Sequence, residues 1–133
     1  MNSKKSILVA DTDRALVREI SMYCQYLGLK PIKAYNARST FELILEHSPD
    51  LICVDSRLQA NGLTVCEVLS RDADFAKIPV ILLADSESPA ELAGRTGDMC
   101  VYCVQKSQNI LRSIEPVVFE LVDIEPVPQP EGQ

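Results

Sequence analysis

The sequence predicts an α/β fold in which a parallel sheet of five strands is covered by helices on both faces. Short apolar runs, such as I-L-V-A at residues 7–10 and L-I-C-V at 51–54, alternate with longer segments whose apolar residues recur at helical spacing. Apolar runs without polar alternation are typical of strands buried on both faces. Helical crossovers between such strands place them parallel to one another.

The strands are predicted from the apolar runs and the turn residues between them. Pro31 has no backbone N–H to donate, which predicts that the second strand lies at an edge of the sheet. Two of the strands run directly into a carboxylate, at Asp11 and Asp55, and the last is followed by Lys106. The five predicted strands are Ser6–Ala10, 30–35, 51–54, 79–84 and Val101–Gln105.

Capping residues mark the predicted helices. Side-chain oxygens at helix starts accept hydrogen bonds from the first free amides, and glycine often follows a helix end, as Gly28 follows the first one. The expected helix starts are Thr12 or Asp13, Asn36, Asn61-Gly62, Ser88 and Ser107. The second helix is expected to bury Ala37, Phe41, Ile44 and Leu45. Pro116 should kink or break the last helix around residues 112–115.

Composition limits the classes of function. The net charge is -6, and no Lys/Arg stripe suits nucleic-acid phosphates, so direct nucleic-acid binding is not expected. No apolar run approaches the ~20 residues of a membrane span, and no signal segment is recognised, so a cytoplasmic protein is predicted. Residues 1–122 are expected to form one domain. The acidic, proline-rich residues 123–133 are interpreted as a disordered tail or linker.

The five cysteines lie mostly in apolar contexts, which predicts buried thiols in a reducing compartment. Cys100 and Cys103 have the spacing of a redox motif. Residues at this spacing on a strand point to opposite faces, so the two are interpreted as structural. With His47 as the lone histidine, no zinc site is predicted.

The strand ends supply a candidate site. In open parallel sheets, ligands bind at the carboxyl ends of the strands. Asp11, Asp55 and Lys106 should therefore converge on one edge. Two carboxylates and an ammonium in one shallow cleft can hold a magnesium ion and neutralise a phosphoryl group. A strand-end carboxylate alone would carry little information, but the coincidence of three such residues favours a functional site.

Three stretches in this order, I-L-V-A-D-T-D, S-P-D-L-I-C-V-D and I-P-V-I-L-L-A, resemble the response-regulator receiver domain of two-component phosphorelay signalling. The resemblance covers residues 6 to about 121 and implies a doubly wound, flavodoxin-like sheet of order 2-1-3-4-5. It implies that Asp55 accepts a phosphoryl group from a histidine kinase or phosphotransfer protein. It also implies that Lys106 contacts that group, and that Asp11, Asp55 and the backbone carbonyl of Arg57 hold Mg²⁺.

The resemblance further implies signalling through protein contacts. The expected surface is formed by the helix after Ser88, the strand Val101–Gln105 and the last helix, and a homodimer is compatible with it. The chain departs from the family at the metal-binding acid and at the switch hydroxyl. The second metal-binding acid is Thr12, a weak neutral ligand, although Asp13 is an alternative donor. The switch hydroxyl after the fourth strand is replaced by Ala84, so weak magnesium binding and impaired switching are expected.

The register of the fifth strand has two alternatives. With Lys106 in the lysine position, Cys103 takes the place of the family's switch aromatic residue. With Gln105 there, Tyr102 becomes that aromatic residue. A one-residue slip flips every side chain, so both cannot hold, and the ammonium favours the first.

Three functions compete: a phosphorylatable receiver, a pseudo-receiver that binds proteins without phosphorylation, and a flavodoxin-like enzyme or FMN binder. The last lacks a Gly-rich phosphate loop after the first strand. No nucleophile–base pair indicates an enzyme.

Overall fold

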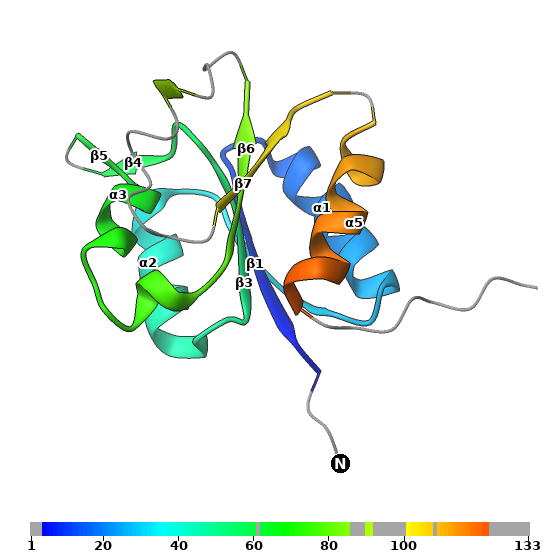
Figure 1. The fold of residues 1–133 in the computed structure, drawn as a ribbon, viewed down its shortest axis with the longest axis horizontal. Coiled ribbons are helices and arrows are strands. Elements are labelled where there is room, and N and C mark those ends of the chain that lie inside the picture. The colour runs from blue at the N-terminus through cyan, green and yellow to red at the C-terminus, as the bar shows by residue number, and fades with distance from the viewer. Residues whose placement is uncertain (1–3, 61, 86–89, 92–100, 108, 123–133) are drawn as a thin grey trace, which may run out of the picture.

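The computed structural model describes residues 4–60, 62–85, 90–91, 101–107 and 109–122 (Figure 1). Its main elements are β1 (Ser6–Ala10), α1 (Arg14–Tyr26), β2 (Lys30–Ala34), α2 (Ala37–His47), β3 (Leu51–Asp55), α3 (Val65–Ser70), β6 (Val80–Ala84), β7 (Val101–Gln105) and α5 (Ile110–Val122). Three short elements complete it: β4 (Gln59–Ala60), β5 (Leu63–Thr64) and the 3₁₀ turn Phe75–Lys77.

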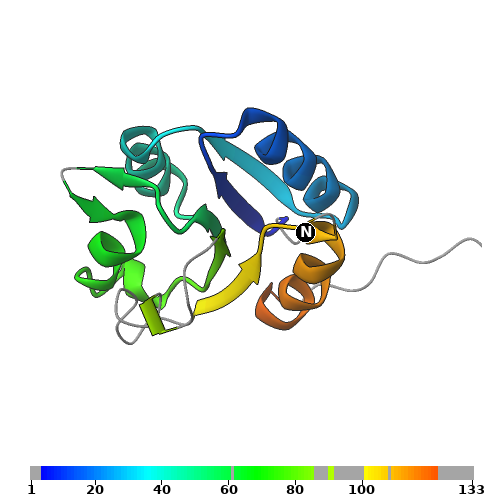
Figure 2. The same ribbon diagram turned by 90° about the horizontal axis from the view of Figure 1, so that it is seen from above.

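The central sheet has the order β2-β1-β3-β6-β7, and every neighbouring pair of strands is parallel. This confirms the predicted fold class and strand order, and β2 with Pro31 lies at an edge. Helices α1 and α5 cover one face of the sheet, and α2 and α3 cover the other (Figures 1 and 2).

Alternation along the strands divides the interior into two cores. Ile7 and Val9 of β1 pack in a core with residues of α1 and α5, and Cys53 of β3 joins them. Leu8 and Ala10 pack in the second core, with residues of α2 and α3. Because both faces are covered, all five residues of β3 and all five of β6 are buried. These strands hold the carboxyl edge in place.

The caps of the first two helices match the prediction. Asp13 Oδ1 accepts a hydrogen bond from Leu16 N at 3.1 Å at the start of α1, and Asn36 Oδ1 accepts one from Ser39 N at 2.8 Å at the start of α2. Gly28 follows α1 with φ of +97°, a conformation that favours glycine.

The predicted start of the third helix at Asn61-Gly62 is wrong. Gly62, with φ of +82°, lies in the turn of a short antiparallel hairpin formed by β4 and β5. Helix α3 begins later, where Thr64 and Glu67 form a capping box. The apolar residues after Gly62 did not by themselves show where the hairpin ends and the helix begins.

Four further expectations require correction. Strand β3 includes Asp55, whereas β2 and β6 are each one residue shorter than predicted. Helix α5 continues through Pro116 without a break, because its buried residues, Ile110, Ile114, Val118 and Val122, anchor it on both sides. Leu45 is 67% exposed, since α2 turns Thr40 and Ile44 toward the core instead. Cys103 is exposed, whereas Cys24, Cys53 and Cys66 are buried.

Some predictions fall outside the described residues. These are the tail at 123–133, Cys100, and most of the helix expected after Ser88, of which Ala90 and Glu91 are described as helical. Within the described part of the chain, no helix has the length and apolar character that a membrane crossing requires.

Candidate functional site

Asp11, Asp55 and Lys106 lie together at the carboxyl edge of the sheet. Side chains alternate along a strand, so Asp11 extends the face of Ile7 and Val9, which pack with α1 and α5. Asp55 extends the face of Cys53 in the same way, and Lys106 extends that of Val104. The structure thus selects Lys106 for the cleft, and Gln105 is exposed.

One ammonium contacts both carboxylates. Lys106 Nζ lies 2.8 Å from Asp11 Oδ2 and 3.3 Å from Asp55 Oδ1. The carboxylates are almost entirely buried, and the lysine side chain is 18% exposed. Partial burial acts to lower the pKa of Lys106, but the hydrogen bonds and negative charges of the two aspartates outweigh it. The pKa of Lys106 is therefore raised, and the ammonium stays charged at neutral pH.

Backbone amides orient the two carboxylates. Asp13 N donates to Asp11 Oδ1 at 3.0 Å, and Arg57 N lies 3.4 Å from Asp55 Oδ1. Both contacts link a residue to the second residue after it, as in an Asx turn. Asp55 Oδ2 accepts no hydrogen bond from any residue that the structure describes. The contacts of Lys106 and Arg57 thus hold Oδ1 in place and leave Oδ2 without a partner among the described residues.

Asp55 lines a surface hollow of about 530 Å³. This hollow lies where the ends of β1 and β3 meet the start of α2. It is lined by Thr12, Asn36, Ala37, Asp55, Arg57, Leu58 and Gln59. Five of these seven residues are polar or charged, which makes the hollow suitable for a polar ligand.

The donor set fits a magnesium ion weakly. Asp11 and Asp55 bring two buried negative charges against the single positive charge of Lys106, and the excess charge favours a cation. Mg²⁺ binds through one or two carboxylates and keeps several waters. Among the described residues, no three His, Cys, Asp or Glu side chains are grouped to hold a metal. Thr12 is exposed beside the hollow, and the carboxylate of Asp13 is occupied in capping α1.

The two positions expected to carry a switch lie away from the cleft. Ala84 is fully buried in the core beneath α2 and α3, and its methyl group cannot donate a hydrogen bond. The hydroxyl of Tyr102 donates to Glu120 Oε1 of α5 at 3.0 Å. With Lys106 in the cleft, Tyr102 does not take the place of a switch aromatic residue.

The side chain of Arg57 was not anticipated in this site from the sequence, which indicated its backbone carbonyl alone. Its Nη2 lies 2.6 Å from Asp85 Oδ2, and this ion pair joins the residues that follow β3 and β6. Asp55 pairs with Leu83 in the neighbouring strand, so the residues two positions further along, Arg57 and Asp85, also lie side by side. This register is not visible in the sequence.

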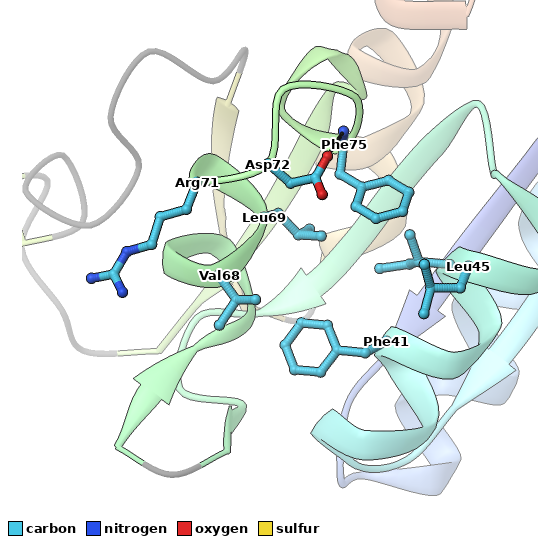
Figure 3. Close-up of a pocket in the computed structure, with 8 residues that line it drawn as sticks. Phe41, Leu45, Val68, Leu69, Arg71, Asp72 and Phe75 are labelled. Atoms are coloured by element: carbon cyan, nitrogen blue, oxygen red, sulfur yellow. Dashed lines mark hydrogen bonds between the residues drawn. The ribbon is translucent and has the colours of Figure 1, made fainter.

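A second hollow, of about 370 Å³, presents few polar or reactive side chains. It lies between α2 and α3 and is lined mainly by apolar side chains, among them Phe41, Leu45 and Phe75 (Figure 3). Asp72 also lines it, but Asp72 Oδ1 accepts hydrogen bonds from the backbone of Asp74 and Phe75. The carboxyl edge is therefore the better candidate for a reactive site.

Known proteins with similar sequences are response regulators, although no protein-family model matches the chain. The polar-differentiation response regulator DivK of Brucella anthropi is 25% identical over 120 residues, which cover 90% of this chain and 98% of that protein. The DNA-binding dual master transcriptional regulator RpaA of Synechocystis is 35% identical over 78 residues. The match covers 58% of this chain and 32% of RpaA, about a third of its length.

Solved structures give the same answer for the fold. The receiver domain of the Francisella response regulator 1452 superimposes with a TM-score of 0.73 at 21% identity, covering 89% of this chain and 96% of that one. The chain has the receiver fold. The resemblance inferred from the three sequence stretches is confirmed at the level of fold and sequence similarity. Receiver domains are signalling domains that interact with kinases and downstream partners.

Proposed function

We propose that the chain is a receiver that accepts a phosphoryl group on Asp55 and passes the change to a protein partner. The observation that supports this best is the asymmetry of the Asp55 carboxylate. Lys106 Nζ and Arg57 N lie beside Oδ1, whereas Oδ2 accepts no hydrogen bond from any described residue, and Asp55 lines the polar hollow. A carboxylate held in this way has one oxygen in position to attack an incoming phosphorus atom.

The proposed step is a single phosphoryl transfer from a phosphohistidine on a kinase or phosphotransfer protein. Asp55 Oδ2 attacks phosphorus, a new P–O bond forms, and the P–N bond breaks. The electron pair of that bond goes to the histidine nitrogen, and Asp55 becomes an acyl phosphate. Lys106 places a positive charge beside the phosphoryl oxygens, which stabilises the charge that they carry in the transition state.

A magnesium ion, when bound, would neutralise further phosphoryl charge in the same cleft. Asp11 and Asp55 would hold it, with the Arg57 carbonyl and the hydroxyl of Thr12 as neutral oxygen donors. Asp11 Oδ1 is already oriented by Asp13 N. This donor set supplies two charges instead of the three that a second acid at position 12 would give, so weak binding is expected.

The pseudo-receiver remains the second candidate because of Ala84 and Thr12. A buried methyl replaces the hydroxyl that would report phosphorylation, and a neutral residue replaces an acid. A module with these losses could bind a partner through its surface alone. In that case Asp55 would not be modified.

Treatment with a small phosphodonor in the presence of Mg²⁺, followed by intact-mass measurement, separates the two functions. The parent chain should gain the mass of one phosphoryl group, and Asp55→Asn should gain none. Asp74→Asn is a matched control, because Asp74 is exposed and its side chain makes no capping hydrogen bond. No adduct on the parent at saturating donor and magnesium would favour the pseudo-receiver.

A further inference from the structure

The ion pair between Arg57 and Asp85 joins the residues that follow β3 and β6, two positions beyond Asp55 and Leu83. Strands β3 and β6 are neighbours, with Asp55 opposite Leu83, and Ser56 N extends the ladder to Leu83 O at 2.9 Å. Arg57 and Asp85 therefore leave adjacent strands at matching positions, and their side chains meet at 2.6 Å. The pair is a direct continuation of the sheet at its carboxyl edge.

Arg57 and Asp55 both line the surface hollow of about 530 Å³. Arg57 thus pairs with the carboxylate of Asp85 and lines the same hollow as Asp55, the residue that would carry the phosphoryl group. The phosphoryl group would carry about -1.5 to -2 charges and three acceptor oxygens, against one charge on the carboxylate. A guanidinium binds either anion in a bidentate manner, and phosphate is the more highly charged of the two.

The existing pair can be broken at small cost. The side chains of Arg57 and Asp85 are 53% and 48% exposed, and ion pairs this open to solvent contribute little stability. By contrast, the contact of Lys106 with Asp11 and Asp55 is buried and is expected to stay in place. Between Lys106 and Arg57, the arginine is the one that can change partner.

We infer that Arg57 binds Asp85 in the unmodified chain and transfers to the phosphoryl oxygens when Asp55 is phosphorylated, reporting the modification in place of the hydroxyl that Ala84 lacks. This inference rests on the proposed function. Its direct consequence is that phosphorylation breaks the ion pair that joins the residues after β3 and β6. Asp85 and the phosphoryl group then compete for Arg57: Arg57 favours the phosphorylated state, and Asp85 opposes it by holding Arg57 away.

Beryllofluoride, a mimic of the phosphoryl group, tests this competition when it is titrated at fixed Mg²⁺ with amide chemical shifts as the readout. Arg57→Gln should weaken beryllofluoride binding about threefold to tenfold, because a charge-assisted contact is lost. Asp85→Asn should tighten binding about twofold to fivefold, since the competitor for Arg57 is removed. In the Arg57→Gln background, Asp85→Asn should have no effect. Arg38→Gln and Glu42→Gln, which remove an exposed ion pair on α2, are the controls.

Each outcome of the titration decides a point. If Asp85→Asn weakens binding, the ion pair merely holds the two loops together, and the inference is wrong. If Asp85→Asn tightens binding equally with and without Arg57, simple charge repulsion explains the effect, and the exchange of partners is again overturned. If neither the parent nor Asp85→Asn binds beryllofluoride or gains a phosphoryl group, the proposed function fails and the inference fails with it.

Discussion

Substitution of Lys106 by methionine tests how the buried charges at the carboxyl edge are balanced. Lys106 Nζ lies 2.8 Å from Asp11 and 3.3 Å from Asp55, and both carboxylates are buried. Removing one member of a buried ion pair costs roughly 3–5 kcal/mol, because the remaining charge is left without compensation. The lysine side chain keeps 18% of its surface exposed, so we expect the lower end, about 3 kcal/mol. For a chain of this size that is a fall in Tm of about 10 °C.

Thermal unfolding of four proteins in magnesium-free buffer measures this effect. Lys33→Met is the matched control, since Lys33 is an exposed strand lysine, and its Tm should hardly change. The double variant Lys106→Met, Asp55→Asn should recover most of the lost Tm, because one of the two uncompensated negative charges has been removed. Added Mg²⁺ should raise the Tm of Lys106→Met more than that of the parent. A loss of less than about 1 kcal/mol in Lys106→Met would refute the reasoning. It would show that Asp11 and Asp55 are compensated by some other group.

Four other measurements follow from the structure. The pKa of Lys106 is raised above 10.5, so its stabilising contribution is fully present below that pH and is lost as pH rises through the higher folded-state value. The difference in unfolding free energy between the parent and Lys106→Met should therefore be constant near neutral pH and shrink above about pH 10.5. Thr12→Asp should tighten Mg²⁺ binding by about 1 kcal/mol, roughly fivefold, in a calorimetric titration, and equal affinities would mean that the neutral ligand is sufficient. Beryllofluoride should shift the amides of residues 56–60 and Asp85 with little change in β7 and α5, whereas large shifts across α5 would show that a switch survives without a hydroxyl at position 84. Gly62→Ala should lower the unfolding free energy by about 1–2 kcal/mol, because a residue with a Cβ is strained at a φ of +82°. No atom lies within 4 Å of an added Cβ, so the cost comes from the backbone and not from a clash. An unchanged Tm would contradict this explanation.

The features of the fold that follow from local chemistry could be predicted. Strand identity, the edge position of Pro31 and the caps at Asp13 and Asn36 depend on residues close in sequence, and the structure has them where expected. The start of α3 could not be predicted in this way, because the apolar residues after Gly62 are compatible with either a hairpin strand or the first turn of a helix. Glycine signals both a turn and a helix boundary, so Gly62 alone could not decide between them.

The candidate site was predictable to the extent that strand ends define it. Asp11, Asp55 and Lys106 converge because parallel strands bring their carboxyl ends to one edge, and alternation along β7 excludes Gln105. The ion pair of Arg57 with Asp85 requires the register of β3 against β6, which no local pattern specifies. The exposure of Leu45 likewise depends on how α2 is rotated against its neighbours.

The buried thiols make the two cores separately observable. Cys24 and Cys53 lie in the core beneath α1 and α5, and Cys66 lies in the core beneath α2 and α3. Burial raises the pKa of Cys24 and of Cys66 to about 12, so neither forms the reactive thiolate until its surroundings open. The rate of alkylation at Cys24 therefore measures how often the first layer of helices separates from the sheet, and that at Cys66 does the same for the second layer. Exposed Cys103 supplies the reference rate, and the chain can report the local stability of both faces without any added label.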